Sequence, residues 1–170
     1  MCNEILTGYP SIDKPWLKYY DINIINQILP QYSMFDYIFQ NNQGYHDNVA
    51  LEYYGQTITY GTLFSEIEKI ATSLASIGVK QGDIVSFLAI TTPEIVFSIY
   101  AVNYLGAICN MIDPRMSEEM ISNIFSNTDS RHLILLDIFS DKISMSNIAD
   151  HCDIILLSDT SQHSSSSNIK

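Results

Sequence analysis

Residues 82–115 constrain the fold of this chain more than any other stretch, because they read as a strand, a helix and a second strand. Residues 84–90 form an almost unbroken apolar run of strand length, and a strand of this kind must be covered on both faces. Thr92, Pro93 and Glu94 then begin a helix, with a side-chain cap, a proline at the first helical position and a carboxylate near the positive end of the dipole. The pattern predicts a right-handed βαβ unit of a parallel sheet.

The chain around this unit continues the alternation of strand and helix patterns. The central helix is apolar around most of its circumference, so we expect it to be largely buried, and Gly106 ends it before a second strand at 107–112. The fold class predicted is therefore α/β, with a largely parallel sheet flanked by helices on both faces. The other expected elements are a helix opening at Ser33, a hairpin over 49–58 that turns at Gly55 and Gln56, a helix from Thr59 to Gly78, a helix opening at Ser117, a strand at 131–136, a helix of weak propensity at 137–150 and a strand at 153–157.

The charge balance and the cysteines limit the classes of partner and the compartment. Nineteen acidic residues against eight basic ones give a net charge of −11, which argues against a nucleic-acid backbone or an anionic membrane surface as partner. Three cysteines without metal-like spacing predict a reducing, cytoplasmic location and no disulfide framework. We see no signal peptide, and no apolar run reaches the ~20 residues of a membrane-spanning helix.

The sequence divides into three parts. Residues 1–32 contain two closely spaced prolines and few periodic apolar positions, which predicts an extended N-terminal arm with one short helix at 21–29. Residues 33–157 carry the alternating pattern and form the folded domain. Residues 158–170 are rich in serine and predict a linker-like tail.

The residues alone identify no catalytic, cofactor-binding or metal-binding group. The glycines stand singly, without a glycine-rich phosphate loop. His151, Cys152 and Asp153 are adjacent, but neighbouring side chains point in different directions and no second ligand pair follows. Cys109 lies in an apolar strand and is expected to be a buried, inert thiol. The remaining titratable candidates are helix-surface carboxylates (Glu66, Glu68, Glu118 and Glu119) and isolated histidines (His46, His132 and His163).

One charged pair has a more informative position. Asp113, Pro114 and Arg115 directly follow the second strand of the central unit. Ligands of open parallel sheets bind at the carboxyl ends of the strands, so this pair is a candidate binding site. Asp-Pro sequences are also common in turns, and a turn with a surface ion pair is the preferred interpretation.

Four segments, in order and at consistent spacing, carry a family resemblance over residues 33–157. They are TITYGTL at 57–63, GVKQGDIV at 78–85, TPE at 92–94 and LGAICNMIDPR at 105–115. The first and last are similar to the first two core motifs of the adenylate-forming (AMP-binding) superfamily, and the Thr-Pro-Glu and Asp-Pro-Arg forms resemble its acyl-CoA synthetases. The ordered run is far more specific than any one of the motifs.

The resemblance implies a two-step ligase that works with ATP, Mg and coenzyme A. In the full-length enzyme, a small carboxylic acid, such as a fatty acid, would attack the α-phosphate of ATP, and a thiol would then take the acyl group from the adenylate. The resemblance also implies that Tyr60 and Leu63 anchor a helix, that Gly106 turns the chain and that Asp113 and Pro114 shape a loop at the sheet edge.

The departures from the family pattern matter as much as the matches. The family's phosphate loop, a Ser/Thr/Gly-rich run that ends in Pro-Lys, does not occur in the 170 residues, nor do its acidic ribose-binding residue and its C-terminal catalytic lysine. We therefore expect residues 33–157 to be the first part of the family's large N-terminal domain. We expect this fragment to be inactive and to hold no cofactor, and we transfer no catalytic residue onto it.

Two other functions are compatible with the sequence. The chain could belong to an amino-acid adenylation domain of a peptide synthetase, which loads a carrier protein instead of coenzyme A. It could also be a non-catalytic binding or interaction module that uses this part of the fold. In either case, the exposed edge of a truncated sheet is compatible with a homodimer.

Overall fold

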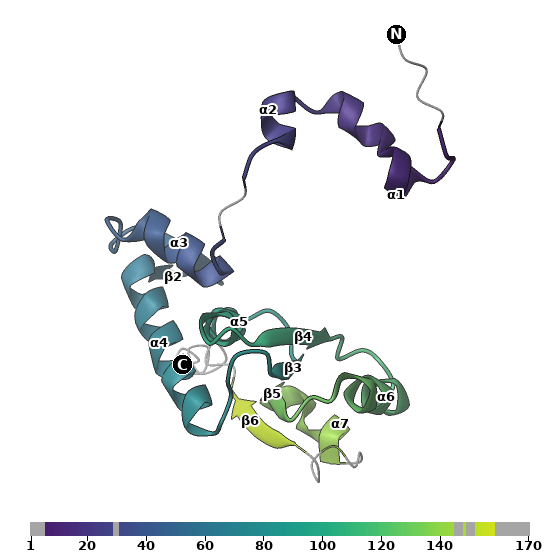
Figure 1. The fold of residues 1–170 in the computed structure, drawn as a ribbon. Helices are drawn as coiled ribbons and strands as arrows, with labels where there is room; N and C mark the ends of the chain where they lie inside the picture. The colour runs from purple at the N-terminus through teal and green to yellow at the C-terminus, as the bar shows by residue number, and fades with distance from the viewer. Residues whose placement is uncertain (1–5, 29–30, 145–147, 149–151, 159–170) are drawn as a thin grey trace. The chain divides into compact units, whose positions relative to one another are not determined.

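The computed structural model describes residues 6–28, 31–144, 148 and 152–158. The chain separates into two compact units, Met1–Gln31 and Tyr32–Lys170 (Figure 1). No helix in the described ranges is both long enough and apolar enough to cross a bilayer. The predicted tail at 158–170 lies, apart from Ser158, outside the described residues, and the division into arm, domain and tail stays a prediction.

The first unit carries short helical segments where the sequence predicts an extended arm. Local hydrogen bonds explain the difference, because the Asp13 carboxylate accepts the backbone N–H groups of Thr7 and Gly8, both at 2.9 Å. Asp21 caps the last segment by accepting the N–H of Asn23 at 2.7 Å, and that helix is shorter than the predicted 21–29. The segments are α1 (Pro10–Asp13), η1 (Pro15–Tyr19) and α2 (Ile22–Ile25).

The second unit has the predicted α/β architecture. Helices and strands alternate along the described residues after a small antiparallel hairpin. The elements are α3 (Met34–Asn42), β1 (Val49–Tyr53), β2 (Gln56–Thr59), α4 (Tyr60–Ser76), β3 (Ile84–Leu88), α5 (Pro93–Tyr104), β4 (Ile108–Ile112), α6 (Glu118–Thr128), β5 (His132–Leu136), η2 (Asp137–Phe139), α7 (Ser140–Ser144) and β6 (Asp153–Leu157).

Among the described residues, four strands form one parallel sheet in the order β4-β3-β5-β6. The chain first moves from β3 to β4 on one side and then crosses to β5 on the other, so β3 lies between β4 and β5. In this register Phe87 of β3 pairs with Met111 of β4 and with Ile134 of β5. The predicted parallel sheet is thereby confirmed.

Helices cover both faces of the sheet (Figure 1), and each face has its own apolar core. The first core joins α3, α4 and α5 to one face, through buried side chains such as Phe87 and Ile134. The second joins α6 and α7 to the opposite face, through Leu88, Leu133 and Leu135. The expectation of helices on both faces is therefore correct.

The helix starts follow the predicted capping chemistry, with one exception. Ser33 forms a reciprocal capping box with Asp36, and the side chains of Thr59 and Ser117 accept backbone N–H groups in the first turns of α4 and α6. Thr92 occupies the N-cap position of α5 but makes no side-chain cap. Its side chain is 1% exposed and enters the packed interior, so Pro93 and the backbone alone define this start.

The hairpin turns one residue earlier than predicted. Its central residues are Tyr54 and Gly55, with φ values of 47° and 80°, and not Gly55 and Gln56. A two-residue turn with positive φ at both central positions matches the right-handed twist of the strands.

Both edge strands of the sheet carry exposed apolar side chains. Ile108 and Met111 of β4 are each 53% exposed, and Leu156 of β6 is 57% exposed. Of the predicted helix at 137–150, η2 and α7 account for residues 137–144, and most of the remainder lies outside the described residues.

Candidate functional site

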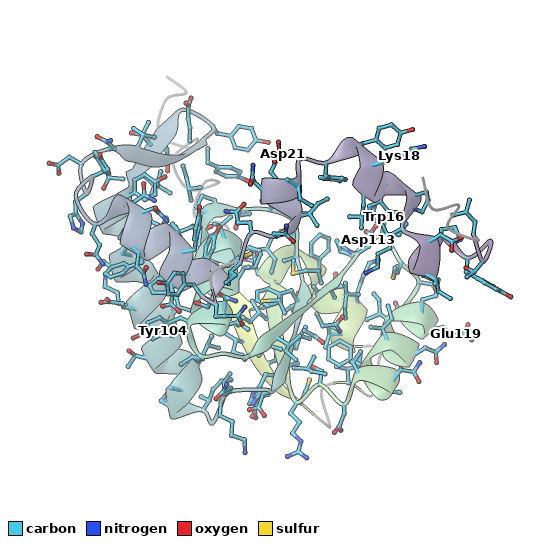
Figure 2. All side chains as sticks on the ribbon, turned by 45° about the horizontal axis from the view of Figure 1, so that its top comes forward. Trp16, Lys18, Asp21, Tyr104, Asp113 and Glu119 are labelled. Atoms are coloured by element: carbon cyan, nitrogen blue, oxygen red, sulfur yellow. The ribbon has the colours of Figure 1, made fainter. Side chains whose placement is uncertain are left out.

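The candidate pair Asp113–Arg115 lies in the loop that follows β4, and Figure 2 labels Asp113. The Asp113 carboxylate accepts the backbone N–H of Arg115 at 2.9 Å, and the guanidinium donates from Nε at 3.0 Å and from Nη2 at 2.6 Å. Since β4 ends at Ile112, this turn stands at the carboxyl end of a parallel strand. The predicted turn and ion pair are thus observed, at the edge where such sheets bind ligands.

The ion pair changes the protonation chemistry of both partners. Hydrogen bonds from the Arg115 side chain, then from its backbone N–H, lower the pKa of Asp113 to about 2, and the charges of Arg115 and Lys142 act in the same direction. The same carboxylate raises the pKa of Arg115. Because the Arg115 side chain is 89% exposed, solvent screens the pair and it contributes little to stability.

Titration of Asp113 should therefore have its midpoint near pH 2 and not near the ordinary value of 3.8. Because the folded pKa is lowered, any stability that the pair contributes is complete above pH 3.8 and is lost as the pH falls through about 2. Carboxyl-carbon NMR of the chain measures the midpoint. Arg115→Gln should move it up toward 3.8, whereas Lys69→Gln, which removes a distant cation, should leave it in place. An unchanged midpoint in Arg115→Gln would contradict the assignment.

Further polar groups near this edge were not identified from the sequence. Thr92 Oγ1, after β3, and Asp137 Oδ1, after β5, are buried oxygen atoms without a hydrogen-bond partner among the described residues. The sequence contains a signal for Asp137, because it is the first polar residue after the completely buried strand β5. Asp113 has the same position after β4. Lys142 of α7 also reaches this edge, where its Nζ contacts the loop after β4.

Cys109 has the character of a structural thiol. Burial raises its pKa to about 11, and its Sγ lies 3.7 Å from the carbonyl oxygen of Ile99. A thiol that holds its proton this strongly is a poor nucleophile at neutral pH. This agrees with the inert role expected from the sequence.

The histidines do not assemble a metal or acid–base site within the part of the chain that the structure describes. Nδ1 of the buried His132 lies 3.6 Å from an Asp153 carboxylate oxygen, and the ring of His46 packs edge-on against Phe64. No group of three or more His, Cys, Asp or Glu side chains there could hold a metal ion. His151 and His163 lie outside the described residues.

The carboxylates that the sequence places on helix surfaces are observed there. Glu66 pairs with Lys69 on α4 at 2.7 Å, and Glu68 is exposed on the same helix. Glu118 and Glu119 are exposed in the first turn of α6, with Glu119 pointing away from the domain (Figure 2).

A cleft of about 280 Å³ opens at the opposite edge of the sheet, by the amino ends of β3 and β5. Its lining includes two cations, Lys80 and Arg131, and two acids, Asp83 and Asp129. The charges balance, so the lining does not select an anion or a cation.

Comparison with known proteins assigns the chain to a family. The profile of the AMP-binding enzyme family matches residues 38–169, which is most of the chain. The chain belongs to this family. Other members of this family are expected to have the same sheet and helices around the loop that contains Asp113.

Relatives and solved structures agree with that assignment. The chain is 30% identical over 125 residues to a 4-coumarate–CoA ligase from Humulus lupulus, covering 72% of this chain and 22% of the relative. It is 25% identical over 145 residues to a long-chain-fatty-acid–CoA ligase from Bacillus subtilis, covering 85% and 26%. A benzoate CoA ligase from Burkholderia xenovorans superposes with a TM-score of 0.69 at 15% identity, covering 74% and 26%, which shows a shared fold. The chain thus spans about a quarter of the length of these proteins.

The family motifs have structural roles in this chain. Leu63 is buried in the first core, and the Tyr60 ring lies 5.8 Å from that of Phe64, so the first motif anchors α4. The motifs at 78–85 and 105–115 contact each other, because the N–H of Gly82 donates to the carbonyl of Gly106 at 3.0 Å. Gly106 has a φ of +71°, and a Cβ there would meet the Gln81 side chain at 3.0 Å, so a larger residue at this junction would be strained and crowded.

Proposed function

We propose that these residues form the first section of an AMP-forming acid–CoA ligase. The observation that carries the proposal is the match of the AMP-binding family across residues 38–169, with its motifs in order on a parallel sheet. The named relatives are CoA ligases for different acids, which supports this reaction class.

The proposed reaction makes a carboxylic acid into a thioester in two steps. A carboxylate is a poor acyl donor until its oxygen becomes part of a good leaving group. Attack of the carboxylate on the α-phosphate of ATP forms the acyl-adenylate and releases pyrophosphate, and AMP is then the leaving group. The acyl-adenylate then reacts with the thiol of coenzyme A and releases AMP. Each step needs positioned phosphate-binding and charge-stabilising groups.

The described residues do not provide those groups by themselves. They contain no glycine-rich phosphate loop, and no cluster of side chains suited to a Mg²⁺ ion is present among them. We derive no catalytic step through ATP, Mg²⁺ or coenzyme A from this part of the chain. Its contribution is the scaffold, together with the Asp113 loop at the ligand-binding edge.

The proposed substrate is a small carboxylic acid, and we assign no particular acid. Relatives of the chain are named for 4-coumarate, long-chain fatty acids and 2-succinylbenzoate. A role in fatty-acid metabolism is therefore one of several that the family supports.

We expect the 170-residue chain to show no carboxylate-dependent ATP–pyrophosphate exchange above background. A longer polypeptide that includes these residues should show exchange with a panel of aliphatic and aromatic acids, and should form a thioester when coenzyme A is added. Exchange by the 170 residues alone would contradict the scaffold role. Exchange by the longer polypeptide only with amino acids, and without a coenzyme A thioester, would favour an amino-acid adenylation domain.

A further inference from the structure

Lys142 makes a contact that spans the ligand-binding edge of the sheet. Its Nζ donates hydrogen bonds to the carbonyl oxygens of Pro114 and Met116, the latter at 3.1 Å. Lys142 follows β5 and the two carbonyls follow β4, and these strands are not neighbours, because β3 lies between them. One side chain therefore joins helix α7 to the loop after β4, past the end of the intervening strand β3.

Both ends of this contact are fixed. Next to Lys142, Ile143 is 3% exposed and belongs to the second apolar core, which holds α7 against the sheet. In the loop, the N–H of Met116 donates to the carbonyl of Asp113 at 3.1 Å, and Ser117 then caps α6. The ammonium group has three donors and no acceptor, so it is suited to bind two carbonyl oxygens at once.

The Asp113–Arg115 ion pair cannot fix this loop on its own. The Arg115 side chain is 89% exposed, and an ion pair between residues two apart constrains only its own turn. Lys142 is half-buried and connects the loop to helix α7. Its hydrogen bonds come from a charged donor, and such bonds are stronger than those between neutral groups.

We propose that Lys142 is a positioning residue that clamps the 113–116 loop and so fixes Asp113 and Arg115 at the ligand-binding edge. The contacts of Lys142 with the carbonyl groups of Pro114 and Met116 support the clamp itself. Its consequence for turnover rests on the proposed ligase function, in which a displaced loop would weaken binding of the substrate that contacts it.

The test uses the polypeptide of the full reading frame that contains these residues, as wild type, Lys142→Met and Lys142→Arg. Lys69→Met is the matched control, because it removes a lysine whose exposed ammonium pairs only with Glu66 on the same helix. Amide hydrogen exchange is measured at Arg115 and Met116, with Phe87 of β3 as the internal reference. The thermal midpoint and the KM and kcat for each substrate are measured in parallel.

Lys142→Met is expected to speed exchange at the loop amides by about tenfold or more while exchange at Phe87 is unchanged, the effect of losing hydrogen bonds to a charged group. Lys142→Arg should restore most of the protection, since a guanidinium can also donate to two carbonyls, and Lys69→Met should match wild type. In an active ligase, Lys142→Met should raise the KM of one substrate by about tenfold and leave the others nearly unchanged.

Two results would overturn the proposal. One is unchanged exchange in the loop of Lys142→Met. The other is a parallel rise in the amide exchange rates of the loop and of Phe87 that Lys142→Arg does not reverse. That result would mean a general loss of stability. A wild-type protein without ATP–pyrophosphate exchange would count against the proposed function, while the hydrogen-exchange comparison would still decide the clamp.

Discussion

Replacing Phe87 with alanine is expected to lower the free energy of unfolding by about 3–5 kcal/mol. The Phe87 side chain is completely buried in the middle of β3, and it packs in the core formed with α4 and α5. Truncation removes the apolar contacts of the ring and leaves a cavity that the neighbouring strands cannot close, because β3 is held on both sides by β4 and β5.

A loss of this size is large against the stability of a domain, which is of the order of 5–15 kcal/mol. Urea unfolding of the 170-residue chain, followed by circular dichroism, measures it from the shift in midpoint at constant m-value. The transition should move to a much lower urea concentration, and a partly unfolded baseline in the absence of urea would be consistent with the upper end of the range.

Met111→Ala is the matched control for this prediction. Met111 is the register partner of Phe87 on the neighbouring strand β4, and it is 53% exposed. Only part of its surface is removed from water, so we expect a loss of about 1 kcal/mol or less. Equal losses for the two variants would contradict the placement of the core between the sheet and α4 and α5.

The sequence predicts the strands, most helices and their caps because these signals are local. The apolar run at 84–90, the serine at position 33 and the glycine at position 106 each act within a few residues, and the structure places β3, the start of α3 and the end of α5 accordingly. The first unit shows where local signals compete. The prolines of this segment predict extension, whereas the hydrogen bonds of Asp13 to Thr7 and Gly8 favour turns.

The candidate site could be predicted only in part, because its geometry depends on strand order. Asp113 was found from its position after a strand, a rule that applies equally to Asp137. Lys142 carries no such signal, since it lies 26 and 28 residues from the carbonyl groups that it binds. The failure of the Thr92 side chain to cap α5 also depends on tertiary packing. Packing turns this side chain inward and away from the first turn of α5.

Ser86 is a polar residue inside the apolar run of β3, and the structure gives it a partner on each neighbouring strand or loop. The Nδ2 of Asn110 on β4 donates to Ser86 Oγ at 2.9 Å, and Ser86 Oγ donates to Ser130 Oγ at 2.9 Å. Ser130, just before β5, lies within hydrogen-bond distance of the backbone carbonyls of Ile84 and His132. This row of polar groups joins β3 to its register partner on β4 and to the residue that lies two positions before β5.

Ser86→Ala is expected to lower the free energy of unfolding by about 1–3 kcal/mol. The Ser86 side chain is completely buried, so its loss leaves the half-buried Asn110 amide without this acceptor and the buried Ser130 hydroxyl without a donor. The cost arises mainly from these unsatisfied partners and not from the hydroxyl removed. For that reason Ser86→Ala combined with Asn110→Ala should cost less than the sum of the two single changes.

Ser98→Ala makes the same chemical change at an equally buried position and separates the network from simple hydroxyl loss. Ser98 is 1% exposed, and its Oγ donates only to the carbonyl of Glu94 one turn earlier in α5. Alanine at this position leaves no other side chain without its hydrogen-bond partner, and alanine favours the helix. We therefore expect the free energy of unfolding to change by about 0.5 kcal/mol or less. Urea unfolding measures both variants. If Ser86→Ala and Ser98→Ala lose the same stability, the Ser86 side chain does not contribute to linking β3 to its neighbours, and the register of the sheet rests on its backbone hydrogen bonds and apolar contacts.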